Sequence, residues 1–388
     1  TEQRTPRSTY LREVEKRSLP PLSLVMRHQD KPNGVYLANR GLGDLHMAPL
    51  IETIDLLPNV DTINLNDNRL TDATLMPLML KLTSMKSLTH LDLSFNKIDD
   101  SSEVIMDYIK SPECCLTTLI LNGADVDDTE AGNLSQALAL NSSLLTLSLA
   151  HNLLGNDEPK VAANKDMITG GVAIGQMLEV NKTITKLDLS WNAIRLGSAE
   201  KLAMSIRKNS TLTELHLGHN GFGDNATQII GRALKTNHTL TALDISYNSL
   251  NPKSVAVLAN SLVFNDKVSY VNLDGNILGK VGTQAMVAAI QRAASGVRSM
   301  HISFNDCDCR KVEHGLFDPA NPAGTQIVDL STPYGVMVVD ECMYLANFRA
   351  GVTLLKLEYS AGGAFHRVPL NIETTSVGNF SIDAFRKT

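Results

Sequence analysis

Residues 187–194 read Leu-Asp-Leu-Ser-Trp-Asn-Ala-Ile, and this stretch decides the fold because its pattern returns along most of the chain. The shared phrase is Leu-x-Leu-x-x-Asn-x-Leu, in which other apolar residues replace some leucines. Its asparagines are Asn68, Asn96, Asn152, Asn192, Asn220, Asn248, Asn276 and Asn305. Most steps between them are 28 or 29 residues, the step from 96 to 152 is twice 28, and Ala124 occupies the skipped position. A fixed period of this length is typical of a repeat architecture.

Each repeat is predicted to form a strand, a turn and a helix. The leucines alternate with other residues at the period of a half-buried strand. The asparagine follows the strand, where its amide can bond backbone groups of the bending chain, and Ala124 interrupts this ladder once. Residues 199–206 then place Leu202 and Ile206 four apart, as on one face of a helix. Strands pack about 4.8 Å apart and helices about 8–10 Å, so we predict an α/β horseshoe solenoid with strands on the concave face and helices on the convex face.

Weaker copies of the phrase extend the array at both ends, with strands expected around Val35, Val328 and Leu355. We predict an N-terminal cap at residues 1–34, repeats at 35–335 and a C-terminal cap at 336–388. The first cap should contain a helical stretch at 10–17, and the second should contain strands at 353–359 and 379–385. The 40-residue step from Asn152 to Asn192 places an inserted loop near residues 156–167, which is either a binding element or a tolerated surface loop.

The repeats resemble the ribonuclease-inhibitor-like subfamily of leucine-rich-repeat proteins, the 28-residue class that includes the Ran GTPase-activating protein and the sensor ends of NOD-like receptors. The resemblance covers about residues 35–335 and implies the horseshoe fold. It does not imply a particular partner, because members of one fold bind unrelated proteins. The five cysteines of this chain depart from the cysteine-rich ribonuclease inhibitor, and its Arg386-Lys387-Thr388 end departs from the acidic tail expected of a Ran-type activator.

Several function classes are not expected. A net charge of −6 argues against nucleic acid, and the chain has no apolar run long enough for a membrane helix or a signal peptide, so we expect an intracellular, cytoplasmic protein. Five scattered cysteines indicate reduced thiols rather than a disulfide scaffold. Four Asn-x-Ser/Thr sequons, at Asn141, Asn181, Asn209 and Asn237, share one repeat position, so we interpret them as structural rather than glycosylated.

No catalytic motif is evident. Residues 275–281 imitate a phosphate-binding loop but have the wrong spacing and lack its final Ser or Thr. The Cys307-Asp308-Cys309 run lacks a second ligand pair for a metal. Paired acids such as Asp99-Asp100 and Asp127-Asp128 follow the repeat turn, where we expect them to cap and favour the start of the next helix. We therefore expect no enzyme activity, no cofactor and no metal.

The residue between the two leucines should point out of the concave face. At that position the chain has few cations and many acids and histidines, and the candidate partner-binding residues are Asp92, Asp188, His216, Asp244 and His301. Such a row is complementary to a basic or amphipathic partner segment. The alternative is a solvated sheet face that binds nothing.

The residue just before the asparagine forms a second row along the strand edge. Its candidate partner-binding residues are Phe95, His151, Trp191, His219, Tyr247 and Phe304, with Asp67 and Gly275 interrupting the row. Exposed aromatic side chains in line are typical of interface hot spots. The alternative is that aromatic or His residues are common at this position in the repeat class because they pack over the strand edge, without binding a partner.

The sequence therefore favours a non-enzymatic protein–protein interaction module or scaffold, monomeric on its own, that binds a protein partner and neither nucleic acid nor membrane. One alternative is a GTPase-activating protein of the Ran type, for which Arg69 would be the matching loop arginine. Another is a structural subunit of a cytoskeletal or ciliary assembly.

Overall fold

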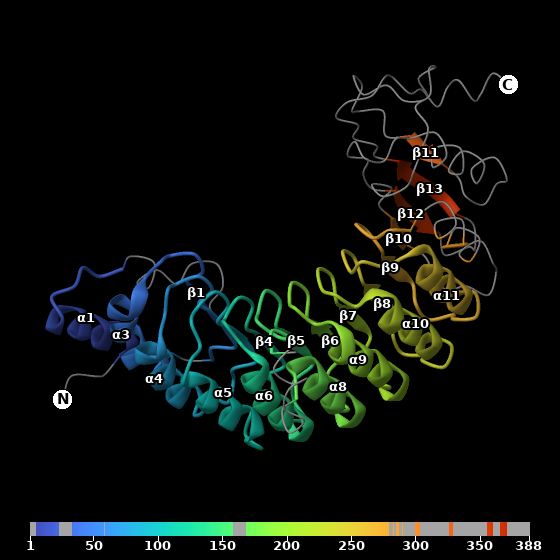
Figure 1. Cartoon of the computed structure of the whole chain (residues 1–388). Helices are drawn as coiled ribbons and strands as arrows, with labels where there is room; N and C mark the ends of the chain where they lie inside the picture. The colour runs from blue at the N-terminus through green and yellow to red at the C-terminus, as the bar shows by residue number, and fades with distance from the viewer. Residues whose placement is uncertain are drawn as a thin grey trace. The chain divides into compact units, whose positions relative to one another are not determined.

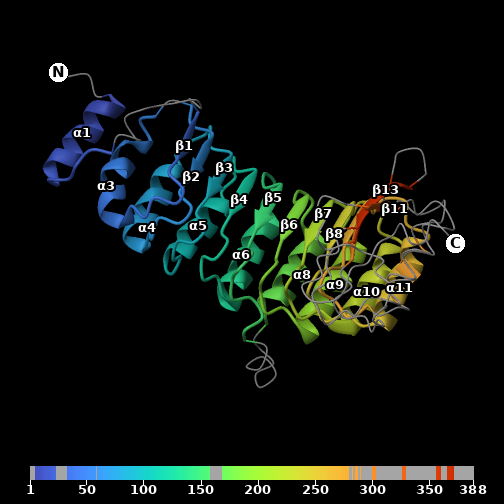
Figure 2. The ribbon, with the colours of Figure 1, turned by 90° about the horizontal axis from the view of Figure 1, so that it is seen from above.

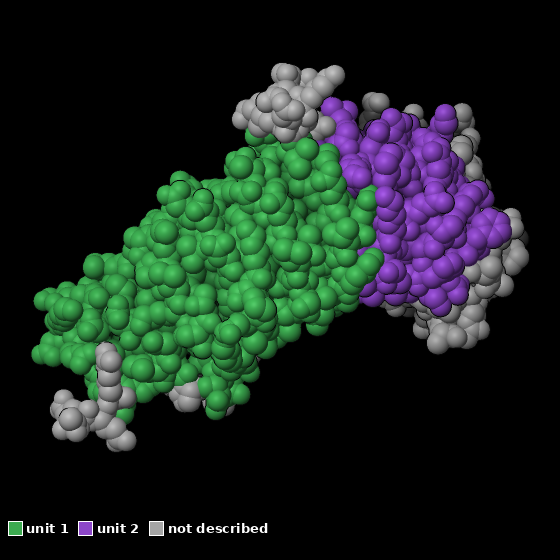
Figure 3. Space-filling model, turned by 90° about the horizontal axis from the view of Figure 1, so that it is seen from below, with its two compact units in different colours: residues 1–192 green, residues 193–388 purple. Residues whose placement is uncertain are grey.

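The computed structural model describes residues 5–22, 33–57, 59–157 and 168–278, four single residues between 282 and 289, and the backbone of four later strands. These strands are residues 299–302, 326–328, 355–359 and 365–370. The chain divides into two compact units, residues 1–192 and 193–388, which Figure 3 colours separately. Both units are built from the same strand–helix repeat.

Unit 1 is a parallel sheet covered by helices. Its strands lie side by side in chain order on one face, and the helices lie on the opposite face (Figures 1 and 2). The strands are β1 (Gly34–Tyr36), β2 (Thr62–Asn64), β3 (His90–Asp92), β4 (Thr118–Ile120), β5 (Thr146–Ser148) and β6 (Lys186–Asp188). The helices are α1 (Pro6–Lys16), α3 (Gly43–Ile54), α4 (Asp72–Leu82), α5 (Ser101–Lys110), α6 (Asp128–Leu140) and α8 (Gly170–Val180).

Unit 2 continues the same repeat and then changes its strand pairing. Its helices are α9 (Leu196–Lys208), α10 (Gly223–Leu234) and α11 (Pro252–Leu262), and its parallel strands are β7 (Glu214–His216), β8 (Ala242–Asp244), β9 (Tyr270–Asn272) and β10 (Ser299–Ile302). Three antiparallel strands follow in the order β12 (Leu355–Tyr359), β13 (Phe365–Leu370) and β11 (Gln326–Val328). The predicted α/β solenoid of strand–helix repeats is confirmed in each unit.

The leucines of the repeat phrase form the core. Leu91 in β3 pairs in register with Ile63 in β2 and Leu119 in β4, and all three side chains are buried. Burying one such aliphatic side chain stabilises the fold by roughly 1.5–3 kcal/mol. Equivalent leucines of adjacent repeats lie next to one another. Burying the leucines of one repeat therefore requires the repeats on either side of it.

The asparagine ladder is confirmed, and Asn96 shows how it works. Its Oδ1 accepts bonds from the amides of Asn68 and Leu70 at 3.2 and 3.0 Å, and its Nδ2 donates to the carbonyls of Leu65 and Leu93, both at 3.0 Å. The side chain is fully buried, so these bonds satisfy groups that water cannot reach. One amide thus ties each strand end to the preceding repeat.

Ala124 shows what happens when that amide is missing. In the neighbouring repeats the second residue after the asparagine donates its amide to the next asparagine, as Leu70 does to Asn96. The equivalent Ile98 donates instead to the backbone carbonyl of Ala124 at 3.3 Å. The predicted single break in the ladder is therefore present, and the backbone compensates for part of it.

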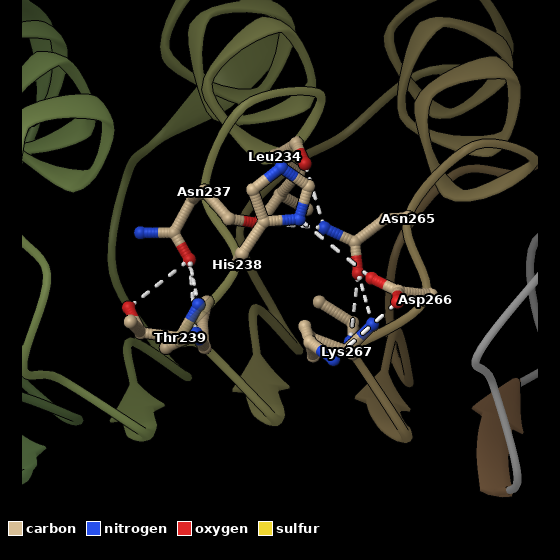
Figure 4. A network of polar contacts seen from close by, with 9 residues as sticks. Leu234, Asn237, His238, Thr239, Asn265, Asp266 and Lys267 are labelled. Atoms are coloured by element: carbon tan, nitrogen blue, oxygen red, sulfur yellow. Dashed lines mark hydrogen bonds and ion pairs between the residues drawn. The ribbon is translucent and has the colours of Figure 1, made fainter.

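A second asparagine row lies in the turns after the helices and bonds each turn to the end of the helix in the preceding repeat. Asn237 donates its Nδ2 to the carbonyl of Ile206 and accepts from the Thr239 amide. Asn265 repeats the arrangement one repeat later, donating to the carbonyl of Leu234 and accepting from the Lys267 amide (Figure 4). Asn141 and Asn181 use the same atoms in unit 1 and are also buried. Because glycosylation needs a free, exposed Nδ2, the structural interpretation of these sequons is supported.

The paired acids at the helix starts differ in which backbone amides they bond. Asp127 caps α6, accepting from the amides of Thr129 and Glu130 at 2.8 and 3.0 Å, as predicted. Its neighbour Asp128 is buried and instead accepts from amides of the next repeat, which the sequence interpretation missed. Asp100 makes no side-chain cap at the start of α5, so capping its own helix is a wrong prediction for that residue.

The chain ends agree in part with the prediction. Helix α1 confirms the helical stretch of the N-terminal cap, and it packs against α3. Strand β12 confirms a strand within 353–359, whereas 379–385 lies outside the described residues. The weak repeat copies at Val328 and Leu355 are not further parallel strands, because β11 and β12 pair antiparallel. The boundaries at 34/35 and 335/336 stay predictions.

Candidate protein interface

In unit 1 the strand face presents the two predicted acids in fixed positions. Asp92 and Asp188 are partly buried at the ends of β3 and β6. The Oδ1 of Asp92 accepts from the Ser94 amide and hydroxyl at 3.0 and 2.7 Å, and that of Asp188 accepts from the Ser190 amide at 2.9 Å. A serine two residues after each acid therefore holds its carboxylate on the strand face.

In unit 2 the predicted residues His216 and Asp244 lie opposite one another on β7 and β8, and Asn272 on β9 follows in register. Asp244 accepts from the Ser246 amide and hydroxyl at 2.9 and 2.7 Å through Oδ1, and from the Asn272 side chain at 3.0 Å through Oδ2. His301 lies beside Asn272 by backbone register, and its side chain is outside the described part of the chain.

Asp274 is a residue of this face that the sequence interpretation missed. It lies two residues after Asn272, so the two-residue period of a strand puts both residues on the same face. Its Oδ1 is buried and accepts no hydrogen bond among the described residues. Burial, and then the charge of Asp244, raise the pKa of Asp274 to about 6. The face therefore carries two interacting carboxyl groups in unit 2.

The predicted aromatic row on the strand edge has an unusual backbone. Phe95, His151 and Trp191 in unit 1 have φ of 54°, 58° and 56°, and His219 and Tyr247 in unit 2 have φ of 55° and 51°. This left-handed region suits Gly, Asn and Asp and costs other L-residues roughly 1–2 kcal/mol each. Other repeats do place such residues there: Asn39, Asp67, Gly123 and Gly275.

The rings of this row stack on one another within each unit. In unit 1 the His151 and Trp191 rings lie 5.0 Å apart at 15°, and Phe95 lies 6.3 Å from His151. In unit 2 the His219 and Tyr247 rings lie 4.2 Å apart at 11°. Phe95, Trp191 and Tyr247 remain about half exposed. The structure thus brings five of the six predicted edge residues into two exposed groups of aromatic rings, in which Phe95 is tilted at 45° to His151 and the other two pairs are stacked. Phe304 lies outside the described residues.

Glycines make room for two of these rings. A side chain at Gly123 would overlap the Phe95 ring, and one at Gly275 would overlap the Tyr247 ring. Each ring therefore lies over the backbone of the next repeat. The absence of a side chain at Gly123 lets Phe95 approach His151 across the intervening repeat. Gly275 interrupts the aromatic row, and its missing side chain leaves the space that the Tyr247 ring occupies.

The inserted loop is tied at its base by one carboxylate. Asp128 accepts from the amides of Gly155 and Asp157 on one side and Gly170 on the other, at 2.7, 2.8 and 2.5 Å. Most of the predicted loop, residues 158–167, lies outside the described residues. Whether it binds a partner stays a prediction. Arg69, the candidate arginine of a GTPase activator, is exposed at φ 56° after β2, and that alternative also stays a prediction.

Two further features are absent from the described part of the chain. It contains no helix long and apolar enough to cross a membrane. It also contains no group of three or more His, Cys, Asp or Glu side chains arranged to hold a metal ion. The Cys307–Cys309 segment considered above lies outside these residues.

Comparison with known proteins finds similarity to leucine-rich repeats in several segments of the chain. A family model described as Leucine Rich repeat matches residues 84–102, 180–203, 208–226 and 236–259. NACHT, LRR and PYD domains-containing protein 5 of Mus musculus is 37% identical over 93 residues, which cover 24% of this chain and 8% of that protein. Protein 3 of the same series, also from Mus musculus, is 28% identical over 137 residues, covering 35% and 13%. The chain therefore matches only a small part of the length of these relatives.

Two solved structures are similar to parts of this chain. Leiomodin-1 Actin-Binding Site 2 is 25% identical with a TM-score of 0.32, covering 40% of this chain and 84% of that chain. The tropomodulin C-terminal domain of Caenorhabditis elegans is 15% identical with a TM-score of 0.33, covering 42% and 90%. The repeat matches and the curated relatives support a leucine-rich-repeat protein and, more generally, a protein-interaction module.

Proposed function

We propose that this chain is a non-enzymatic interaction module that binds a partner protein through its strand face and its aromatic strand edge. We include in the proposal the ribonuclease-inhibitor-like subfamily, a cytoplasmic location and a monomeric state on its own. The 28-residue period supports the subfamily. Sequence similarity to parts of larger leucine-rich-repeat proteins supports a module whose role is recognition.

The observation that carries the proposal is the placement of bulky rings in a backbone conformation that disfavours them. Residues held in sparsely populated conformations cluster at functional sites, where the surrounding structure sustains the strain. Stacking of the rings offsets part of that cost, at roughly 0.5–1.5 kcal/mol per pair. Stacking alone would not require half of each ring to face solvent, whereas an interface would use that exposed area as an anchor.

The strand face supplies the second half of the surface. Asp92 and Asp188 in unit 1, and Asp244 in unit 2, accept the side-chain bonds given above, and the backbone amide of Asp274 donates to the Asn272 side chain at 3.1 Å. Like charges on one face steer an oppositely charged partner and set its orientation more than they add affinity. The partner segment should therefore be basic or amphipathic, with apolar residues for the rings.

The test is affinity capture from a native lysate with the parent chain and two triple variants. In the edge variant Phe95, Trp191 and Tyr247 are changed to Asn, which tolerates the left-handed backbone and so favours correct folding. In the control variant three apolar side chains of the helix face and its turns, which are more exposed still, are changed to Asn: Leu80, Leu140 and Phe264.

A partner that the parent and the control retain and the edge variant loses supports the proposal, provided that all three proteins show the same circular dichroism. A partner that both variants retain excludes the aromatic edge as the binding surface. Equal loss in both variants indicates non-specific apolar association and contradicts the proposal.

A further inference from the structure

The strand face of unit 2 carries two acidic side chains, Asp244 and Asp274, that differ in how their oxygens are hydrogen-bonded. Asp244 is bonded at both carboxylate oxygens by Ser246 and Asn272, whereas the buried Oδ1 of Asp274 accepts no bond among the described residues. The charges of both acids also raise the pKa of the Tyr270 phenol, after the larger effect of burial. Three oxygen-bearing side chains from β8, β9 and the turn after β9 therefore share one negatively charged region.

The outward positions of the described strands nearest this pair carry no Lys or Arg, and within unit 2 the first cation by backbone register is Lys356 on β12, which pairs with His301 on β10. The outward positions of β7, β8, β9 and the turns after them are Glu214, His216, Gly218, Ala242, Asp244, Ser246, Tyr270, Asn272 and Asp274. At Gly218 a Cβ would lie 2.8 Å from the Ser246 hydroxyl and 3.4 Å from the Asp244 carboxylate, so no side chain of β7 covers that carboxylate from this position. A buried carboxylate without a cation is costly, and an arriving cation relieves that cost.

An aromatic surface adjoins the acids. The Tyr247 ring lies over the backbone of Gly275, the residue directly after Asp274, and stacks on His219. The Tyr247 amide also donates to the Asp274 carbonyl at 2.7 Å, which ties the two positions together. The rings are partly exposed, so an incoming group can contact them and the carboxylates together.

A planar guanidinium suits this surface, since it pairs with carboxylates through directed N–H donors and its flat faces can contact the exposed part of an aromatic side chain. An ammonium group offers only a point charge. We propose that the strand face of unit 2 binds an arginine side chain of the partner protein, held by Asp244 and Asp274 and in contact with the exposed part of the Tyr247 ring. This inference rests on the proposed function and names the chemistry of the partner segment.

The experiment measures fluorescence anisotropy of a labelled, end-capped peptide of alternating serine and arginine, at low salt and pH 7.5. The test variant is Asp274→Asn, which keeps the side-chain shape. The matched control is Asp266→Asn in the same unit, because it removes the same charge from a turn on which Asp266 faces His238 and Lys267 (Figure 4). Peptides with lysine or glutamine in place of arginine complete the set.

The expected result is a loss of affinity of about tenfold or more for Asp274→Asn and of less than about twofold for Asp266→Asn. The arginine peptide should bind more tightly than the lysine peptide, and the glutamine peptide should not bind. Equal losses in both variants would show general charge attraction and overturn the site. Equal affinity for arginine and lysine would overturn the guanidinium assignment.

Failure here is separable from failure of the proposed function. If the parent captures a partner through the aromatic edge but does not bind the arginine peptide, the interaction module stands and the arginine site is wrong. If the peptide binds as expected and the edge variant still captures the same partner as the parent, the aromatic edge is not the site of capture.

Discussion

Trp191→Asn should leave the protein more stable than Trp191→Ala, although both substitutions delete the same ring. The ring is half exposed and stacks on His151 at 5.0 Å, and both variants lose these contacts equally. They differ in the backbone at φ 56°, which Asn tolerates and which costs Ala roughly 1–2 kcal/mol. The expected difference in the free energy of unfolding is therefore about 1 kcal/mol in favour of Asn.

The assay is denaturation in urea, with midpoints and slopes compared between the two variants and the parent. Leu140, the exposed last residue of α6, provides the control, because at a helical position Ala is preferred to Asn by roughly 0.5–0.7 kcal/mol. The order of stability of the Asn and Ala variants should therefore reverse between positions 191 and 140. If Ala equals or exceeds Asn at 191, the left-handed position is not strained, and the main argument for an aromatic interface fails.

Three further results are expected. Asn96→Ala should lower the free energy of unfolding by about 2–6 kcal/mol in a denaturant titration, because two buried amides of the preceding repeat lose their acceptor at roughly 1–3 kcal/mol each; a loss below 1 kcal/mol would show that the backbone compensates as at Ala124. Because the folded-state pKa of Asp274, about 6, lies above its ordinary 3.8, its contribution to stability should be largest below pH 4 and decline as the pH rises to about 6. Asp274→Asn should remove that part of the pH dependence, and an unchanged profile would contradict it. Asp128→Asn should lower the unfolding temperature because an amide replaces a carboxylate that accepts three backbone bonds, whereas Asp127→Asn should have a smaller effect, since Asn also caps helices.

The repeat phrase predicted the strands, the buried leucines and the asparagine ladder because each follows from a local rule that repeats along the chain. Leu91 is buried for the same reason as Leu119, and Asn96 bonds as Asn68 does. The rows on the strand face and edge followed from the two-residue period of a strand. Which of these residues bind a partner stays a prediction.

The sequence also contained a weaker indication that the backbone is left-handed at the edge position. Asn39, Asp67, Gly123 and Gly275 occupy the same place in other repeats, and these residue types share a tolerance for positive φ. Comparing the aromatic positions with those four residues would have indicated the strain at Phe95 or Trp191 from the sequence.

Other features depend on contacts between repeats that no local pattern records. Asp128 bonds the start of the next repeat rather than its own helix, and Phe95 approaches His151 because Gly123 between them has no side chain. The buried, unbonded oxygen of Asp274 depends on the neighbouring strand and its Asp244. The sequence by itself determined the repeating unit, because backbone geometry and burial follow from residues close in the chain. Only the tertiary structure decided which side chains of adjacent repeats meet, because that depends on the space each neighbour leaves.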